Sequence, residues 1–134
     1  MAMKIAYIMR GVQGSGKSTL ARTLANGTGT IHSTDDFFYV DGEYRFNPER
    51  LRENHDRNFE AFCRSLNDGV PIVICDNTNT MRWHFERYAE AASQAGYLVA
   101  FVVMRHPNPE VAAQRNIHKV SAAVIQRTID EWEN

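Results

Sequence analysis

The stretch GVQGSGKST, residues 11–19, constrains the fold of this chain more than any other part of the sequence. It fits the pattern G-x-x-x-x-G-K-[S/T], and it lies between a short apolar run and a segment with helical periodicity. Glycines in such a loop let backbone N–H groups curl around phosphate oxygens, and the N-terminus of the following helix adds partial positive charge. The stretch therefore predicts a phosphate-binding loop between a buried strand and a helix.

The positions of this loop have expected roles in binding ATP and Mg²⁺. Lys17 is expected to reach the β- and γ-phosphates, and the Ser18 hydroxyl is expected to ligate Mg²⁺. The alternative, a glycine-rich turn with an exposed lysine, is disfavoured because the strand and helix on either side are those that a phosphate loop requires. The predicted nucleotide site comprises Gly11, Gln13, Gly14, Ser15, Gly16, Lys17, Ser18 and Thr19.

Short apolar runs alternate with helical periods along the rest of the chain. We predict strands at residues 4–9, 30–34, 71–75 and 97–103, helices at 18–26, 48–67, 81–94, 109–116 and 121–133, and a loop with an Asp-Gly turn at 36–48. Apolar strands without polar alternation are typical of a parallel sheet covered on both faces. The pattern predicts a single α/β domain, residues 1–134, with three layers.

Carboxylates follow the second and third predicted strands, at the edge of the sheet where ligands bind. Asp35 is the predicted general base, because it can face the γ-phosphate and accept a proton from an acceptor hydroxyl. The second strand is expected to lie next to the first. Asp76 is predicted to order Mg²⁺ through water, with a turn-forming role as the alternative. Asp36 is expected to diverge from Asp35 in an extended segment, or to cap a helix.

The segment QRNIHKV, residues 114–120, supplies two basic side chains. Arg115 and Lys119 are spaced to lie one helical turn apart on one face. This spacing is typical of a lid that closes over phosphates, with an arginine stabilising the transferring charge. The alternative is a solvated helix face. His118 and His106 are expected to be surface residues.

Seven stretches between residues 9 and 132 carry a family resemblance: MRGVQGSGKSTLA, STDDFF, GEYRFNPERL, NHDRN, CDNTNT, YAEAASQAGY and QRNIHKVS. In this order they resemble the P-loop (AAA-type) kinase domain of the eukaryotic Nedd-binding-protein-like proteins, which is related to the 5′-kinase domain of phage polynucleotide kinase. The resemblance implies a P-loop kinase-type three-layer fold with a four-stranded parallel sheet and a short helical lid. It implies transfer of the γ-phosphate of ATP to a 5′-hydroxyl of DNA or RNA, with Lys17, Asp35 and Arg115 catalytic and Lys119 assisting at the nucleotide.

The residues expected at the phosphate acceptor are Asp35, Phe38, Arg45, Asn79 and Arg82. The phage kinase has an arginine three residues beyond its catalytic aspartate, where this chain has Phe38. Relatives in the wider group phosphorylate sugars, antibiotics and nucleotide sugars. Three functions therefore stay open: a polynucleotide 5′-hydroxyl kinase, a small-molecule or toxin-like kinase, and a nucleotide-binding module without turnover. The complete set of Lys17, Ser18, Asp35 and Arg115 weighs against the third.

The composition and the absence of certain motifs argue against other classes of protein. The net charge of −1 argues against a general nucleic-acid-coating protein, but not against recognition of a strand end. A GTPase would need a guanine-reading Asn-Lys-x-Asp run, which the sequence lacks. With no secretory signal and no apolar run of membrane length, we expect a cytoplasmic protein with no membrane partner and with reduced thiols at Cys63 and Cys75. The sequence gives no strong signal for an oligomer.

Overall fold

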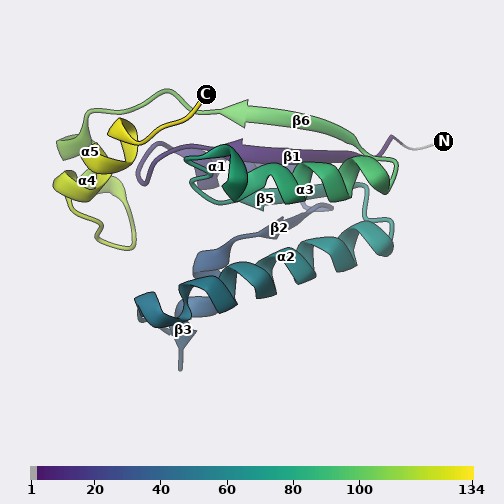
Figure 1. The fold of residues 1–134 in the computed structure, drawn as a ribbon, viewed down its shortest axis with the longest axis horizontal. Helices are drawn as coiled ribbons and strands as arrows, with labels where there is room; N and C mark the ends of the chain where they lie inside the picture. The colour runs from purple at the N-terminus through teal and green to yellow at the C-terminus, as the bar shows by residue number, and fades with distance from the viewer. Residues whose placement is uncertain (1–2) are drawn as a thin grey trace.

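Four parallel strands form the central sheet of the computed structural model, which describes residues 3–134 (Figure 1). They are β1 (Ile5–Arg10), β2 (Thr30–His32), β5 (Ile72–Asp76) and β6 (Leu98–Val103), and their spatial order is β2-β5-β1-β6. The register pairs Met9 of β1 with Asp76 of β5. Because these strands are parallel, their carboxyl ends lie side by side at one edge of the sheet. The predicted four-stranded parallel sheet is confirmed.

The expectation that the second strand lies next to the first is wrong, because β5 lies between β2 and β1. Val73, Ile74 and Cys75 of β5 are completely buried, whereas the three residues of β2 are all half-buried. A strand that is apolar on both faces is most stable inside the sheet, where helices cover both sides. Asp76, rather than Asp35, therefore lies at the carboxyl end of the strand beside the one that leads into the phosphate loop.

Helices cover the two faces of the sheet and give it three layers. On one face, α1 (Lys17–Ala25) packs through Ala21 and Ala25 against Met9. On the other face, α2 (Leu51–Asn67) and α3 (Arg82–Gln94) bring Phe62 and Tyr88 against Ile8. Successive residues of β1 thus enter two separate cores, which explains why this strand is apolar throughout.

The segment predicted as a loop at residues 36–48 contains short regular elements. They are a 3₁₀ helix (Thr34–Phe38), strands β3 (Tyr39–Val40) and β4 (Glu43–Tyr44), and a second 3₁₀ helix (Pro48–Arg50). β3 and β4 pair as an antiparallel hairpin. The expected turn at Asp41 and Gly42 is confirmed: both have positive φ angles, of 52° and 79°, as a tight hairpin turn requires.

Two C-terminal helices, α4 (Pro109–Arg115) and α5 (Ala122–Asp130), pack on the phosphate loop. Val12 of the loop forms a small apolar cluster with Ala112 of α4 and Ile125 of α5. Across residues 3–134, every helix falls short of the length and apolar character that a membrane crossing requires.

Candidate active site

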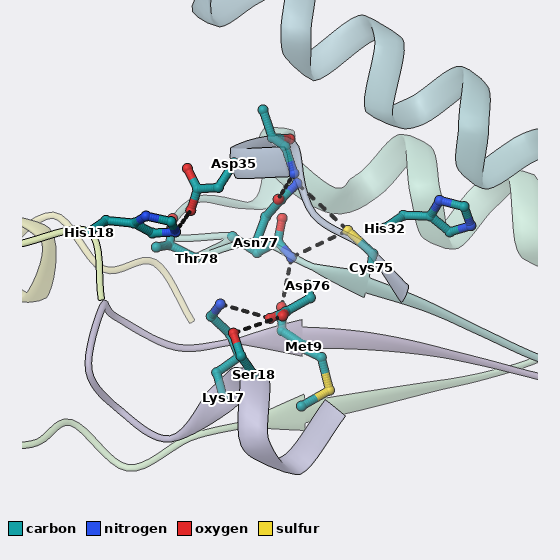
Figure 2. Close-up of polar contacts among 12 residues, drawn as sticks. Met9, Lys17, Ser18, His32, Asp35, Cys75, Asp76, Asn77, Thr78 and His118 are labelled. Atoms are coloured by element: carbon teal, nitrogen blue, oxygen red, sulfur yellow. Dashed lines mark hydrogen bonds and ion pairs between the residues drawn. The ribbon is translucent and has the colours of Figure 1, made fainter. Parts of the chain in front are cut away.

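The carboxyl ends of β1 and β5 bring the phosphate loop and Asp76 together (Figure 2). Lys17 Nζ lies 2.8 Å from Asp76 Oδ1, and Ser18 Oγ donates a hydrogen bond of 3.0 Å to Asp76 Oδ2. The Lys17 and Asp76 side chains are only 12% and 5% exposed, so this ion pair is shielded from water. One carboxylate thus holds both residues that the sequence assigns to the phosphates and Mg²⁺.

The donor set fits ATP and Mg²⁺. Hydroxyl and carboxylate oxygens, such as those of Ser18 and Asp76, are the ligands that Mg²⁺ prefers. Gly16 has a φ of 90° and precedes α1, whose N-terminus lacks a side-chain cap and an acidic residue in the described structure. Its first backbone N–H groups are therefore available to a phosphate. Within the described residues, the buried Oγ of Ser15 also has no hydrogen-bond partner.

Gly14 lets the lid helix approach the phosphate loop closely. Its φ is +78°, and a Cβ added to it would lie 2.4 Å from the carbonyl oxygen of Ala112 and 2.8 Å from its Cβ. Both atoms belong to α4, which has little freedom to retreat because Ala112 is buried against Val12. Glycine at this position is thus required both by the backbone angle and by the neighbouring helix.

Gly14→Ala is expected to lower stability by more than the usual cost of alanine at positive φ, which is about 1–3 kcal/mol. Gly27→Ala is the matched control, because Gly27 has a φ of +74° and a Cβ there would meet nothing within 4 Å. Urea unfolding of the two variants separates the backbone cost from the clash with α4. Equal losses would show that α4 does not press on the loop.

Asp35 lies in the first 3₁₀ helix and is contacted on both carboxylate oxygens. Tyr44 Oη donates a 3.2 Å hydrogen bond to Oδ1, and His118 Nε2 lies 3.6 Å from Oδ2. Tyr44 comes from β4 and His118 from the loop after α4, so two distant segments meet at this acid. His118 is half-buried, which corrects its assignment as a surface residue. The sequence feature that could have indicated a role for His118 at the site is its place within QRNIHKV, three residues after Arg115.

Asp36 follows Asp35 in the same 3₁₀ helix, so the expected extended segment is wrong. Successive side chains still diverge, because they project about 120° apart around a 3₁₀ helix. Burial raises the pKa of Asp36, and the carboxylates of Asp35 and Asp76 raise it further, while His118 lowers it. The two neighbouring acids therefore have different surroundings.

The lid residues lie apart from each other. Arg115 Nη2 donates to the carbonyl oxygen of Gly14, which places the guanidinium on the phosphate loop. Lys119 is exposed and lies beyond the end of α4, with a φ of 57°. The prediction of one helical face for Arg115 and Lys119 is wrong, because Asn116 ends the helix by donating its side-chain amide to the carbonyls of Ala112 and Ala113.

The fold buries two of the five residues that were predicted at the phosphate acceptor. Phe38 is 2% exposed and packs against Phe46 with ring centroids 5.1 Å apart. Asn79 is 1% exposed and donates to the carbonyl of Met9, so it braces the root of the phosphate loop. Neither buried side chain is available to an acceptor in this structure.

The two arginines predicted at the acceptor are exposed and have other partners. Arg45 pairs with Glu43 within the hairpin, at 3.0 Å. Arg82 Nε donates to the carbonyl of Asn134, and the Arg82 backbone N–H donates to Glu133. Arg45 lies on the same hairpin as Tyr44, whereas Arg82 is held by the C-terminal residues.

A phosphate loop after a central parallel strand, an acid at the end of the neighbouring strand and a lid helix packed on the loop define the P-loop kinase fold. The chain belongs to the AAA domain family, whose sequence profile matches residues 7–133. It is 36% identical over 137 residues to NEDD4-binding protein 2 of Homo sapiens, covering 96% of this chain and 8% of that protein. The predicted family resemblance is confirmed, and the chain spans less than a tenth of this relative.

Solved structures show the same fold. A chain of the Pnkp1/Rnl/Hen1 RNA repair complex superposes with a TM-score of 0.74 and 18% identity, over 98% of this chain and 44% of that one. A gluconokinase from Sinorhizobium meliloti 1021 gives a TM-score of 0.63 and 20% identity, over 99% of this chain and 76% of that one. At these identities the likeness is one of fold alone.

Proposed function

We propose that this chain is an ATP-dependent phosphotransferase whose acceptor is the 5′-hydroxyl of a polynucleotide. The observation that carries the proposal is the meeting of three elements at one edge of the sheet. The phosphate loop presents Lys17, the first 3₁₀ helix presents Asp35, and the lid helix places Arg115 on the loop. A cytoplasmic location and a single domain over residues 1–134 stay predictions.

The proposed reaction needs little covalent chemistry from the protein. Asp35 accepts the proton of the acceptor hydroxyl while the oxygen of that hydroxyl forms a bond to the γ-phosphorus. The bond from the γ-phosphorus to the bridging oxygen breaks, and ADP leaves. Lys17 and Arg115 stabilise the charge on the phosphates during this transfer. Mg²⁺, held by Ser18 and through water by Asp76, would neutralise β- and γ-phosphate charge.

The hairpin beside Asp35 supports a nucleic acid as the acceptor. Tyr39 and Phe46 are 44% and 54% exposed. Tyr39 packs edge-on against Tyr44, which contacts the proposed base. Exposed aromatic rings stack on bases, and each stacked base contributes about 1–3 kcal/mol to the binding free energy. Arg45 adds an exposed guanidinium to the same hairpin, although Glu43 pairs with it. A small hydroxyl compound is the second candidate acceptor, because the fold is shared with a gluconokinase.

An acceptor panel with γ-labelled ATP tests the proposal. The panel contains 5′-hydroxyl DNA and RNA oligonucleotides, the same oligonucleotides with 5′-phosphates, and sugars including gluconate. We expect label on the 5′-hydroxyl strands only. Label on a sugar but not on a strand would show that the acceptor is a small molecule, and the assignment as a phosphotransferase would stand. Bound ATP with no transfer to any acceptor or to water would favour a nucleotide-binding module.

Asp35→Asn is expected to retain ATP binding and to lose transfer by roughly a hundredfold or more, the scale of a positioned base. Asp36→Asn is the matched control at the adjacent position, and we expect it to lose much less. Initial rates with the labelled acceptor and calorimetry with ATP measure the two effects. Equal losses in both variants would remove the assignment of Asp35 as the base.

A further inference from the structure

The loop after α4 is a compact turn built around one asparagine. Asn116 Nδ2 donates to the carbonyls of Ala112, Ala113 and Val120, and Asn116 Oδ1 accepts from the backbone N–H of Val120 at 2.7 Å. These bonds close residues 116–120 on themselves. The loop position is thus fixed by its own hydrogen bonds and by the end of α4.

This turn separates its side chains into outward and inward ones. Ile117 is 81% exposed, whereas the His118 side chain is only 18% exposed. The His118 ring stacks on Tyr44 with centroids 3.9 Å apart and an angle of 30° between the planes. It also meets Tyr39 edge-on at 6.2 Å. The turn thus places the imidazole against the hairpin.

The stacked imidazole reaches the carboxylate of Asp35 (Figure 2). Its Nε2 lies beside Oδ2, while the Tyr44 hydroxyl donates to Oδ1. A carboxylate contacted on both oxygens has little freedom to rotate, and orientation decides how well a base meets its proton. One contact comes from the hairpin and the other from the loop after α4, and these two segments are far apart in the sequence.

We propose that His118 is a positioning residue that orients Asp35 and couples it to the lid. This inference rests on the proposed function, because it concerns the base of that reaction. Arg115, three residues earlier, contacts the carbonyl of Gly14 on the phosphate loop. One short segment therefore touches the nucleotide site and the base at the same time. With α4 packed on the phosphate loop, Arg115 on the nucleotide side and the orientation of the base depend on the same short segment.

His118→Ala is expected to lower kcat for phosphate transfer about tenfold, a part of the roughly hundredfold or larger effect of the base itself. ATP affinity should change less than about twofold, because the polar and ring contacts of His118 are with Asp35, Tyr39 and Tyr44. His118→Gln should recover most of the rate, since its amide nitrogen reaches the place of Nε2. Ile117→Ala is the matched control from the same turn and should keep the full rate.

A double-mutant cycle with Asp35→Asn tests whether His118 acts through the base. If it does, adding His118→Ala to Asp35→Asn should change the residual rate by less than about twofold. Multiplied losses, a failure of His118→Gln to restore the rate, or an equal loss of ATP affinity would each overturn the positioning role. A wild type that transfers phosphate to no acceptor would overturn the proposed function itself, and the role of His118 with it.

Discussion

Lys17→Ala is expected to abolish phosphate transfer and to weaken ATP binding by more than about a hundredfold. Lys17 is the one cationic side chain of residues 11–19, and in P-loop proteins this lysine reaches the β- and γ-phosphates. Its removal also leaves the buried carboxylate of Asp76 without the ammonium group that now lies 2.8 Å away. An uncompensated buried charge costs roughly 3–5 kcal/mol, so the variant should also unfold at lower temperature.

A double variant separates these two effects. Lys17→Ala combined with Asp76→Asn removes both charges, so most of the thermal stability should return while ATP binding stays lost. Calorimetry with ATP and Mg²⁺ measures binding, and thermal unfolding measures stability. Unchanged ATP affinity and activity in a folded Lys17→Ala protein would contradict the nucleotide site.

Arg115→Ala is expected to lower kcat by about a thousandfold, the lower end of the range for an arginine that stabilises the transferring phosphoryl group. The KM for ATP should rise by less than about threefold, because the proposed role of this arginine is to act mainly in the transition state. Its present contact with the Gly14 carbonyl shows that the guanidinium reaches the loop. Arg115→Lys should restore little, since a lysine lacks the planar fork.

Steady-state rates over a range of ATP concentrations measure both constants. Arg127→Ala removes an exposed arginine from the neighbouring helix α5 and serves as the matched control. A wild-type kcat in Arg115→Ala would remove the lid assignment. A large rise in the KM for ATP at unchanged kcat would make Arg115 a ground-state binding residue instead.

The parts of the fold that depend on local sequence were predictable. The spacing of glycine, lysine and serine at residues 11–19 indicated the phosphate loop, and unbroken apolar runs indicated the strands. The strand order was not predictable from these runs, because it depends on pairing between segments far apart in the chain. Hence the second strand was expected beside the first, although β5 lies between them.

Side-chain exposure at the site was the hardest feature to predict. Phe38 and Asn79 follow strand-like runs, and only the packed structure shows that both are buried. The partners of Asp35 were also hidden, because Tyr44 and His118 reach it through a hairpin and a turn. The turn depends on Asn116, whose four bonds are side-chain to backbone contacts without a recognisable periodicity.

The position of β1 in the centre of the sheet has a consequence for how the chain folds. Its partners begin at Ile72 and Leu98, so during synthesis Ile5–Arg10 has no neighbouring strand of this sheet until much of the chain has emerged. Non-local pairing of this kind slows folding and leaves an apolar segment open to aggregation. The root of the phosphate loop therefore takes its place late, when these strands pair and Asn79 bonds to the carbonyl of Met9. If ATP binds this loop as proposed, it would assist folding only near the end, by trapping a nearly finished sheet rather than by nucleating one.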